Sequence, residues 1–308
     1  MYDMWQNCMD ILRGLKTDDS QFSAIYMMDP DDDYNDESNW IKCNPSLDEV
    51  ISRKYLRNQL LMCQHEPSQL PATLTKNFNM FCSSVTMWIP DWNIRKCMHK
   101  LDIRDFQNEI CYIGCDFSAV SDLACMALVF PPNPGRSIYP DRFCCIVYSY
   151  LPEVCLERQQ NQELYKQWTR NKHLFTTPGN VCDFDYILKD QLKLNSYLDI
   201  VGLYYDTWNA VSWSVHATNA GLPLFPYSQS LGAFNRPTKE LERMVLTEKV
   251  VFDDNPIIPW SFANVSIKTD HADNVKPVKT EKAKKIDPVI AICQAIGGYF
   301  SENAYSDE

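Results

Sequence analysis

The distribution of apolar positions over residues 110–300 predicts an α/β domain. Three largely apolar runs with short connections favour an antiparallel meander of strands over residues 110–117, 123–130 and 142–150. Beyond the meander, helical spacing alternates with further strand-like runs. Helices are predicted over 153–170, 184–194, 207–220, 239–246 and 288–300, and strands over 200–206 and 223–227. This succession is typical of a mixed β-sheet flanked by helices.

The first third of the chain carries a different pattern. Residues 1–16 have helical spacing, residues 22–28 form an apolar run that suits a strand, and a longer helix is predicted over 47–63 with Ser46 as its N-cap. The acidic stretch 29–39, which includes Pro30, is predicted to be a solvated loop. Its run of acids at 31–33 is not expected to be a calcium site, because it lacks the alternating ligand spacing of an EF-hand. A shorter, mainly helical part is therefore expected before the α/β domain.

The net charge is concentrated in one segment. The 308 residues carry a formal charge of −11, which taken alone argues against a generic nucleic-acid binder. Residues 17–50 hold ten acids and one base, and because residues 1–16 are neutral, the stretch 51–308 carries only −2. A basic cluster there either contacts DNA phosphates or faces solvent in a loop; its members are Lys276, Lys279, Lys282, Lys284 and Lys285.

The cysteine spacing and the hydropathy of the chain indicate the cellular compartment that we expect for it. The 13 cysteines are scattered without a C-x-x-C pair, so we expect a reducing, cytosolic compartment and neither a disulfide framework nor a zinc site. The N-terminus lacks the pattern of a signal peptide. The longest apolar run, residues 123–130, is too short to span a membrane.

Three aspartates are embedded in apolar sequence. Asp116 lies in the first predicted strand, Asp206 closes a later strand, and Asp287 precedes Pro288 at the start of the last helix. Taken singly, each could be a turn cap or a local hydrogen-bond acceptor. Burying a carboxylate is costly unless it is paired or binds a cation, so three such acids suggest a cluster around Mg²⁺ or Mn²⁺. Two such ions can support phosphodiester hydrolysis.

Several short motifs occur in the order found in one known family. They are Trp40-Ile41-Lys42-Cys43-Asn44-Pro45-Ser46, Gly114-Cys115-Asp116-Phe117-Ser118, Thr176-Thr177-Pro178-Gly179-Asn180, Tyr205-Asp206-Thr207-Trp208-Asn209-Ala210 and Lys284-Lys285-Ile286-Asp287. Together they resemble the large subunit of tailed-bacteriophage terminases over most of the chain. The resemblance implies an RNase H-like nuclease that cuts concatemeric double-stranded DNA during genome packaging, in the host cytoplasm and not in the mature virion.

The resemblance also assigns roles to individual residues. It places Asp116, Asp206 and Asp287 on the family's three metal-binding acids, with Asp116 bridging two Mg²⁺ or Mn²⁺ ions. Asp122 is a candidate for an additional acid beside the site, with a hairpin-turn role as the alternative. The residues that follow Asp206 have helical spacing, which predicts that Trp208 and Trp213 pack in the core and do not stack on bases.

Part of the family's large subunit is missing from this sequence. That subunit begins with a P-loop ATPase, but no G-x-x-x-x-G-K-[ST] is present, so ATP binding is not expected here. We expect residues 1–45 to be a remnant of the ATPase domain, 46–104 a helical linker region and 105–308 the nuclease domain, in a fragment or split-gene product. The implied partners are double-stranded DNA, the terminase small subunit and the portal protein, with no membrane.

Two alternative functions remain open from the sequence. The first is another RNase H-like nuclease of the resolvase or transposase type, which would cut branched junctions or specific ends. The second is a non-catalytic structural piece of a packaging motor, which the missing ATPase keeps in consideration.

Overall fold

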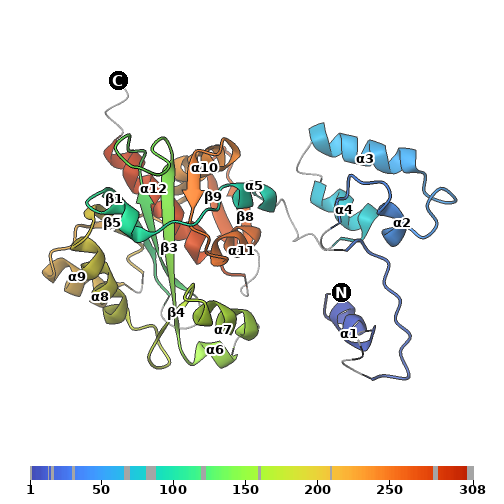
Figure 1. Cartoon of the computed structure of the whole chain (residues 1–308), viewed down its shortest axis with the longest axis horizontal. Helices are drawn as coiled ribbons and strands as arrows, with labels where there is room; N and C mark the ends of the chain where they lie inside the picture. Colours follow the sequence, from blue (N-terminus) through green and yellow to red (C-terminus); the bar gives the residue numbers. More distant parts are fainter. Residues whose placement is uncertain are drawn as a thin grey trace. The chain divides into compact units, whose positions relative to one another are not determined.

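The computed structural model describes residues 2–12, 14, 17–29, 32–65, 70–80, 88–118, 123–158, 161–208, 210–279 and 284–303. The chain divides into two compact units, residues 1–87 and 88–308 (Figure 1). Within the described ranges, no helix has both the length and the apolar composition needed to cross a membrane.

The first unit is helical. Its helices are α1 (Tyr2–Leu12), α2 (Trp40–Cys43), α3 (Arg53–His65) and α4 (Leu70–Phe78). A small core joins α2, α3 and α4, and its largest members include Trp40, Leu56 and Phe78. This core contains residues from both sides of position 45, and the assignment of these parts to an ATPase remnant and a linker stays a prediction.

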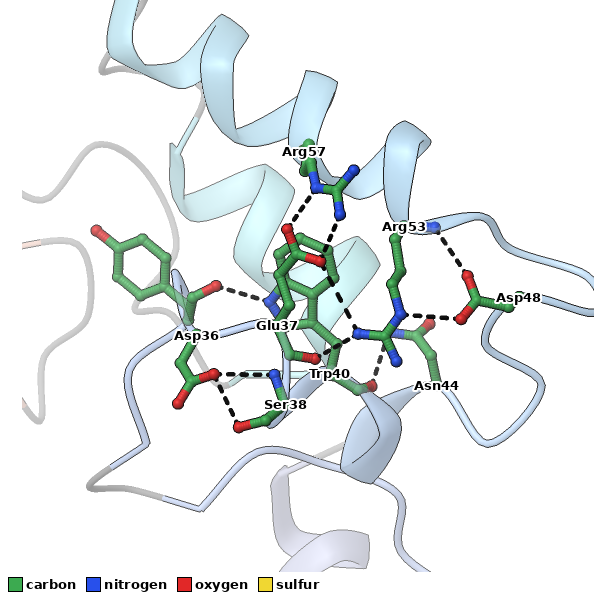
Figure 2. A network of polar contacts seen from close by, with 9 residues as sticks. Asp36, Glu37, Ser38, Trp40, Asn44, Asp48, Arg53 and Arg57 are labelled. Carbon is green, nitrogen blue, oxygen red and sulfur yellow. Dashed lines mark hydrogen bonds and ion pairs between the residues drawn. The ribbon is translucent and has the colours of Figure 1, made fainter.

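The acidic loop of the first unit is tied to helix α3 (Figure 2). Arg57 forms a two-pronged ion pair with the carboxylate of Glu37. Arg53 donates to the backbone oxygen of Glu37 at 2.8 Å and to the carboxylate of Asp48 at 2.9 Å. The structure describes turns and no helix or strand within residues 32–39, as predicted for a loop, but α3 neutralises part of the acidic excess.

Two sequence-based expectations for this unit are wrong. Residues 22–28 pair with no described strand, and most of their side chains are at least partly exposed. The helix predicted to follow Ser46 begins later, at Arg53. Asp48 has a left-handed backbone with a φ of 69°, which interrupts a helix, and the Ser52 hydroxyl accepts a backbone amide of the first turn at 3.2 Å.

The second unit is built on a mixed sheet of seven strands. Their order is β4–β3–β2–β1–β5–β6, with β7 also paired to β3. The predicted meander is confirmed, since β1, β2 and β3 are antiparallel neighbours, while β5 joins β1 and β6 joins β5 in parallel. The bounds are β1 (Ile110–Asp116), β2 (Ala124–Phe130), β3 (Phe143–Pro152), β4 (Phe175–Thr177), β5 (Asp199–Tyr205), β6 (Leu224–Pro226) and β7 (Val250–Phe252).

Helices cover both faces of this sheet, which explains why its central strands are apolar without alternation (Figure 1). One face packs against α5 (Asp91–Lys96), α6 (Cys155–Arg158), α7 (Gln162–Arg170), α10 (Leu231–Leu246), α11 (Ile257–Ala263) and α12 (Asp287–Glu302). The other face packs against the 3₁₀ helix η2 (Ile103–Phe106), α8 (Phe184–Asn195) and α9 (Val211–Asn219). The predicted α/β class is confirmed, although α6 and α7 stand where one helix was expected.

Helix α12 lies unusually close to the central strand. A Cβ atom at Gly114 of β1 would lie 1.8 Å from the backbone oxygen of Ala291 and 2.7 Å from the backbone nitrogen of Ala295. Both distances are far below van der Waals contact. Glycine at position 114 and small residues on the facing helix therefore allow α12 to rest directly on β1.

Helix α10 begins well before the predicted start, because it continues through a proline. The helix starts at Leu231, where the Ser230 hydroxyl caps the first turn. Pro237 has no amide hydrogen for the oxygen of Ala233 four residues earlier. The Tyr227 hydroxyl donates to that oxygen at 2.8 Å, so the carbonyl is satisfied and the helix is not broken.

The buried carboxyl group of Asp253, which follows β7, is expected to make the stability of the fold depend on pH. Its carboxylate accepts the backbone N–H of Val147 at 3.2 Å, and burial raises its pKa from 3.8 to about 7. The folded state then binds this proton more tightly than the unfolded state, so stability is lost as the pH rises from about 4 to 7. Asp253→Asn should remove this loss. We expect the melting temperature of the variant, relative to that of the wild type, to increase over that pH range and to stay at the higher value at pH 8. A difference in melting temperature that does not change with pH would contradict the assignment.

Candidate active site

Two of the predicted acids lie side by side at one edge of the sheet. Asp116 is the last residue of β1, and Asp206 follows directly after the last residue of β5. The two strands are parallel, and Cys115 is paired with Tyr205. An aspartate follows each member of this pair, so the register brings both Asp116 and Asp206 to the carboxyl edge of the sheet. This is the edge at which α/β folds commonly place their functional sites.

The third acid reaches the same place from a helix. Asp287 is the first residue of α12 and is buried, and Pro288 occupies the first turn as predicted. Beneath the acids, burial raises the pKa of the Cys125 thiol well above its usual range, and the negative charges of Asp287 and Asp116 raise it further. The electrostatic influence of both carboxylates on one thiol reflects their common position.

The three acids line one open cavity of about 430 Å³. Ser118, after β1, contributes a hydroxyl to the same wall. Gln229 lies in the segment after β6, which is the third parallel strand of this edge. Gln229 carries no local signal in the sequence and was not predicted, although the rule that carboxyl ends of parallel strands share an edge would have identified its segment.

A small hairpin pairs β8 (Val265–Thr269) with β9 (Val275–Lys279), and residues of β9 line the same cavity. Of the predicted basic cluster, Lys276 and Lys279 lie on β9 and line the cavity. These two strands were not predicted, because short segments that are rich in lysine and contain Pro277 have little strand signal. The pairing of two such strands is a tertiary outcome.

The remaining predicted site residues are placed differently or lie outside the described part. Lys285 is only 6% exposed, and neither it nor Lys284 belongs to the described lining of the cavity. Asp122 and Lys282 lie outside the described residues. Among the described members of the basic cluster, Lys276 and Lys279 on β9 share the cavity with the acids, and a DNA-binding role for the cluster stays a prediction.

The two tryptophans after Asp206 have different environments. Trp213 is buried, and its indole N–H donates to the side chain of Gln191 at 2.9 Å, so the predicted core role is confirmed. The same prediction for Trp208 is wrong, because this side chain is 77% exposed and lines the cavity. Helix α9 begins only at Val211, which leaves Trp208 in the turn before it. The backbone N–H of Trp208 donates to the Asp206 carboxylate at 3.0 Å.

The donor chemistry of the cavity fits a hard divalent cation. In the described ranges, no three His, Cys, Asp or Glu side chains form a preformed ion site. Mg²⁺, however, is commonly held by one or two carboxylates together with water and substrate phosphates, without an all-protein cage. The neighbouring carboxylates of Asp116 and Asp206, with Asp287 on the same cavity, supply such oxygen donors.

Comparisons with known proteins agree with this architecture. The chain is 25% identical to protein YmfN of Escherichia coli (strain K12) over 316 residues, covering 99% of this chain and 70% of that protein. It is 24% identical to the terminase large subunit of Enterobacteria phage HK97 over 280 residues, covering 89% of this chain. This chain spans only 53% of the length of that HK97 protein.

The fold also resembles a solved structure. The crystal structure of the HK97 bacteriophage large terminase superposes with a TM-score of 0.60 at 22% sequence identity, covering 96% of this chain and 60% of that one. The predicted RNase H-like fold is thereby confirmed. The family model described as the terminase large subunit, endonuclease domain, matches residues 15–302. This chain belongs to the terminase large subunit endonuclease domain family.

Proposed function

We propose that this chain is a metal-dependent endonuclease that hydrolyses phosphodiester bonds of double-stranded DNA. The proposal rests chiefly on one observation. Asp116 and Asp206 are adjacent in register at the carboxyl edge of the sheet, and Asp287 joins them on the same cavity. Membership of a terminase endonuclease family supports DNA as the substrate.

Asp116, Asp206 and Asp287 would hold two Mg²⁺ or Mn²⁺ ions. Asp116 would hold metal together with both other acids, because its strand β1 pairs with β5 and also packs against α12. When bound, such ions lower the pKa of water and stabilise a leaving oxygen. The rigid strand ends hold the carboxylates in place, and the Trp208 N–H fixes the orientation of the Asp206 side chain.

The biological setting follows from the same family. We propose that the chain acts in the host cytoplasm during phage genome packaging, where it cuts concatemeric DNA as part of a motor with a small subunit and a portal. The HK97 relative is named as a terminase large subunit, which supports this setting. Residues 1–45 as an ATPase remnant and 46–104 as a linker complete the proposal, with residues 105–308 as the nuclease.

A plasmid assay tests the proposed chemistry. The whole chain, stripped of metal, is expected to leave supercoiled DNA intact, because the carboxylates alone cannot neutralise the charge that develops on the phosphate. Added Mg²⁺ or Mn²⁺ should restore conversion to nicked and linear forms, and excess EDTA should abolish it again. Gel electrophoresis of the plasmid measures each state.

The alternatives give different results in this assay. Cleavage confined to branched junctions, with intact plasmid throughout, would indicate a resolvase-like enzyme. A folded chain that neither binds Mn²⁺ in calorimetry nor cuts any DNA would instead indicate a structural piece of the motor. Either result would contradict the proposed function.

A further inference from the structure

Lys276 is held in a fixed position inside the acidic cavity. Its ammonium group donates to the backbone oxygen of Gln229 at 2.6 Å and to the side-chain oxygen of the same residue at 3.2 Å. The nitrogen also lies 4.5 Å from the centre of the Phe234 ring, a cation–π distance. Contacts from the segment after β6 and from α10 therefore anchor an amine that is carried by β9.

The surroundings of this amine differ from those of a surface lysine. Burial lowers the pKa of Lys276, while the negative charges of Asp116 and Asp206 oppose that decrease. A partly buried ammonium group is costly unless hydrogen bonds and opposite charges compensate it. Here Gln229, the face of Phe234 and the two carboxylates provide that compensation, so the lysine does not need to order itself when a ligand arrives.

We propose that Lys276 is a substrate-contacting residue of the nuclease centre, a pre-positioned ammonium group that binds the phosphate undergoing cleavage. The inference rests on the proposed function, since it assigns the phosphate of DNA to the cavity. Of the two sequence-based readings of the basic cluster, a phosphate contact or a solvated loop, it favours the phosphate contact for Lys276.

The charge balance of the cavity supports a phosphate as the ligand. In the metal-free chain, Asp116 and Asp206 act as the counter-charges of Lys276. Divalent ions on these carboxylates would offset their charges and weaken their attraction for the ammonium group. A phosphate entering the cavity supplies an anion in their place, while the hydrogen bonds to Gln229 keep the amine in place.

This position predicts opposite effects on metal binding and on cleavage. Lys276→Met keeps the apolar stem and removes the charge, so the cavity becomes more negative. We expect Mn²⁺ to bind about five-fold more tightly in calorimetry with the protein alone. Plasmid nicking should nevertheless fall about 100-fold in kcat, because a charge aimed at the reacting phosphate is lost. Lys276→Arg should recover part of the rate.

Lys268→Met is the matched control. Lys268 is paired with Lys276 across the same hairpin, is exposed, and does not belong to the described lining of the cavity. Its replacement should change neither the Mn²⁺ affinity nor kcat by more than about two-fold, because exposed charges are screened.

Three results would overturn the inference, provided that the wild-type chain cuts DNA. The first is wild-type kcat in Lys276→Met. The second is a decrease in Mn²⁺ affinity together with the loss of nicking, which would identify a merely structural residue. The third is an equal loss in Lys268→Met. A wild-type chain that binds Mn²⁺ without cutting DNA would contradict the proposed function itself, and Lys276 would then have no phosphate to bind.

Discussion

Replacing Asp116 with asparagine is expected to reduce metal-dependent plasmid nicking by about 1,000-fold or more. The substitution keeps the size of the side chain and removes one of the three negative charges that would hold the metal. The carboxamide of the variant would offer one neutral oxygen in place of a carboxylate, which is a poor ligand for a hard divalent cation. Single-turnover nicking in Mn²⁺ measures the loss.

Thermal melting separates this loss of metal binding from a loss of fold. Removing one of three neighbouring carboxylates relieves their mutual repulsion but also removes a counter-charge of Lys276, so Asp116→Asn should melt close to the wild type when metal is absent. Bound ligand stabilises a protein by about 2.7 kcal/mol at 100 times its Kd, so the wild type should melt higher in excess Mn²⁺. The variant should lose most of that increase.

Asp199→Asn is the control for this experiment. Asp199 is the first residue of β5, exposed and at the opposite end of the strand that leads to Asp206. Its replacement should preserve both nicking and the melting response to Mn²⁺. Wild-type nicking by Asp116→Asn would refute the assignment of the centre.

Gly114→Ala is expected to destabilise the second unit by about 3 kcal/mol or more. The added Cβ would lie 1.8 Å from the oxygen of Ala291, an atom of the helix backbone that cannot rotate away. Strand β1 or helix α12 must therefore shift. For a domain of this size, such a loss lowers the melting temperature by roughly 6–12 °C, which differential scanning calorimetry resolves.

The same substitution should also impair catalysis below the melting temperature. Helix α12 carries Asp287, and β1 carries Asp116, so separating the two elements separates two acids of the cavity. We expect nicking to fall even where circular dichroism shows a folded chain, with weaker binding of Mn²⁺ in calorimetry.

Gly232→Ala is the matched control for this close approach. Gly232 lies near the start of α10, and an added Cβ there meets no atom within 4 Å. Alanine should be neutral or should stabilise the helix by up to about 1 kcal/mol. If Gly114→Ala melted like Gly232→Ala, the direct packing of α12 on β1 would be wrong.

The sheet and its acids were largely predictable from the sequence. Strands β1, β2, β3 and β5 are apolar runs because both faces of the sheet are covered. Burial on both faces therefore makes these strands recognisable from their residue types alone. An aspartate at the end of such a run stands out for the same reason. Asp116 and Asp206 could therefore be identified before their strands were known to be neighbours.

Local sequence signals predicted helix bounds less reliably where contacts or backbone conformation elsewhere override them. Pro237 predicts a helix boundary, but the Tyr227 hydroxyl supplies the missing donor and α10 continues through it. Ser46 has the sequence context of an N-cap, but the positive φ of Asp48 moves the helix start to Arg53. Neither outcome can be derived from residue preferences in a short window.

The sequence by itself determined the α/β class, the central strands, the helix that begins at Asp287 and the identity of the three acids, because each leaves a local pattern of burial or charge. The tertiary structure alone decided that β9 pairs with β8 and lines the cavity of the acids, that Lys276 lies there beside Gln229, and that Trp208 is exposed at the same cavity. The physical reason is that these features depend on contacts between segments far apart in the chain. The properties of residues that are neighbours in the sequence do not predict such contacts.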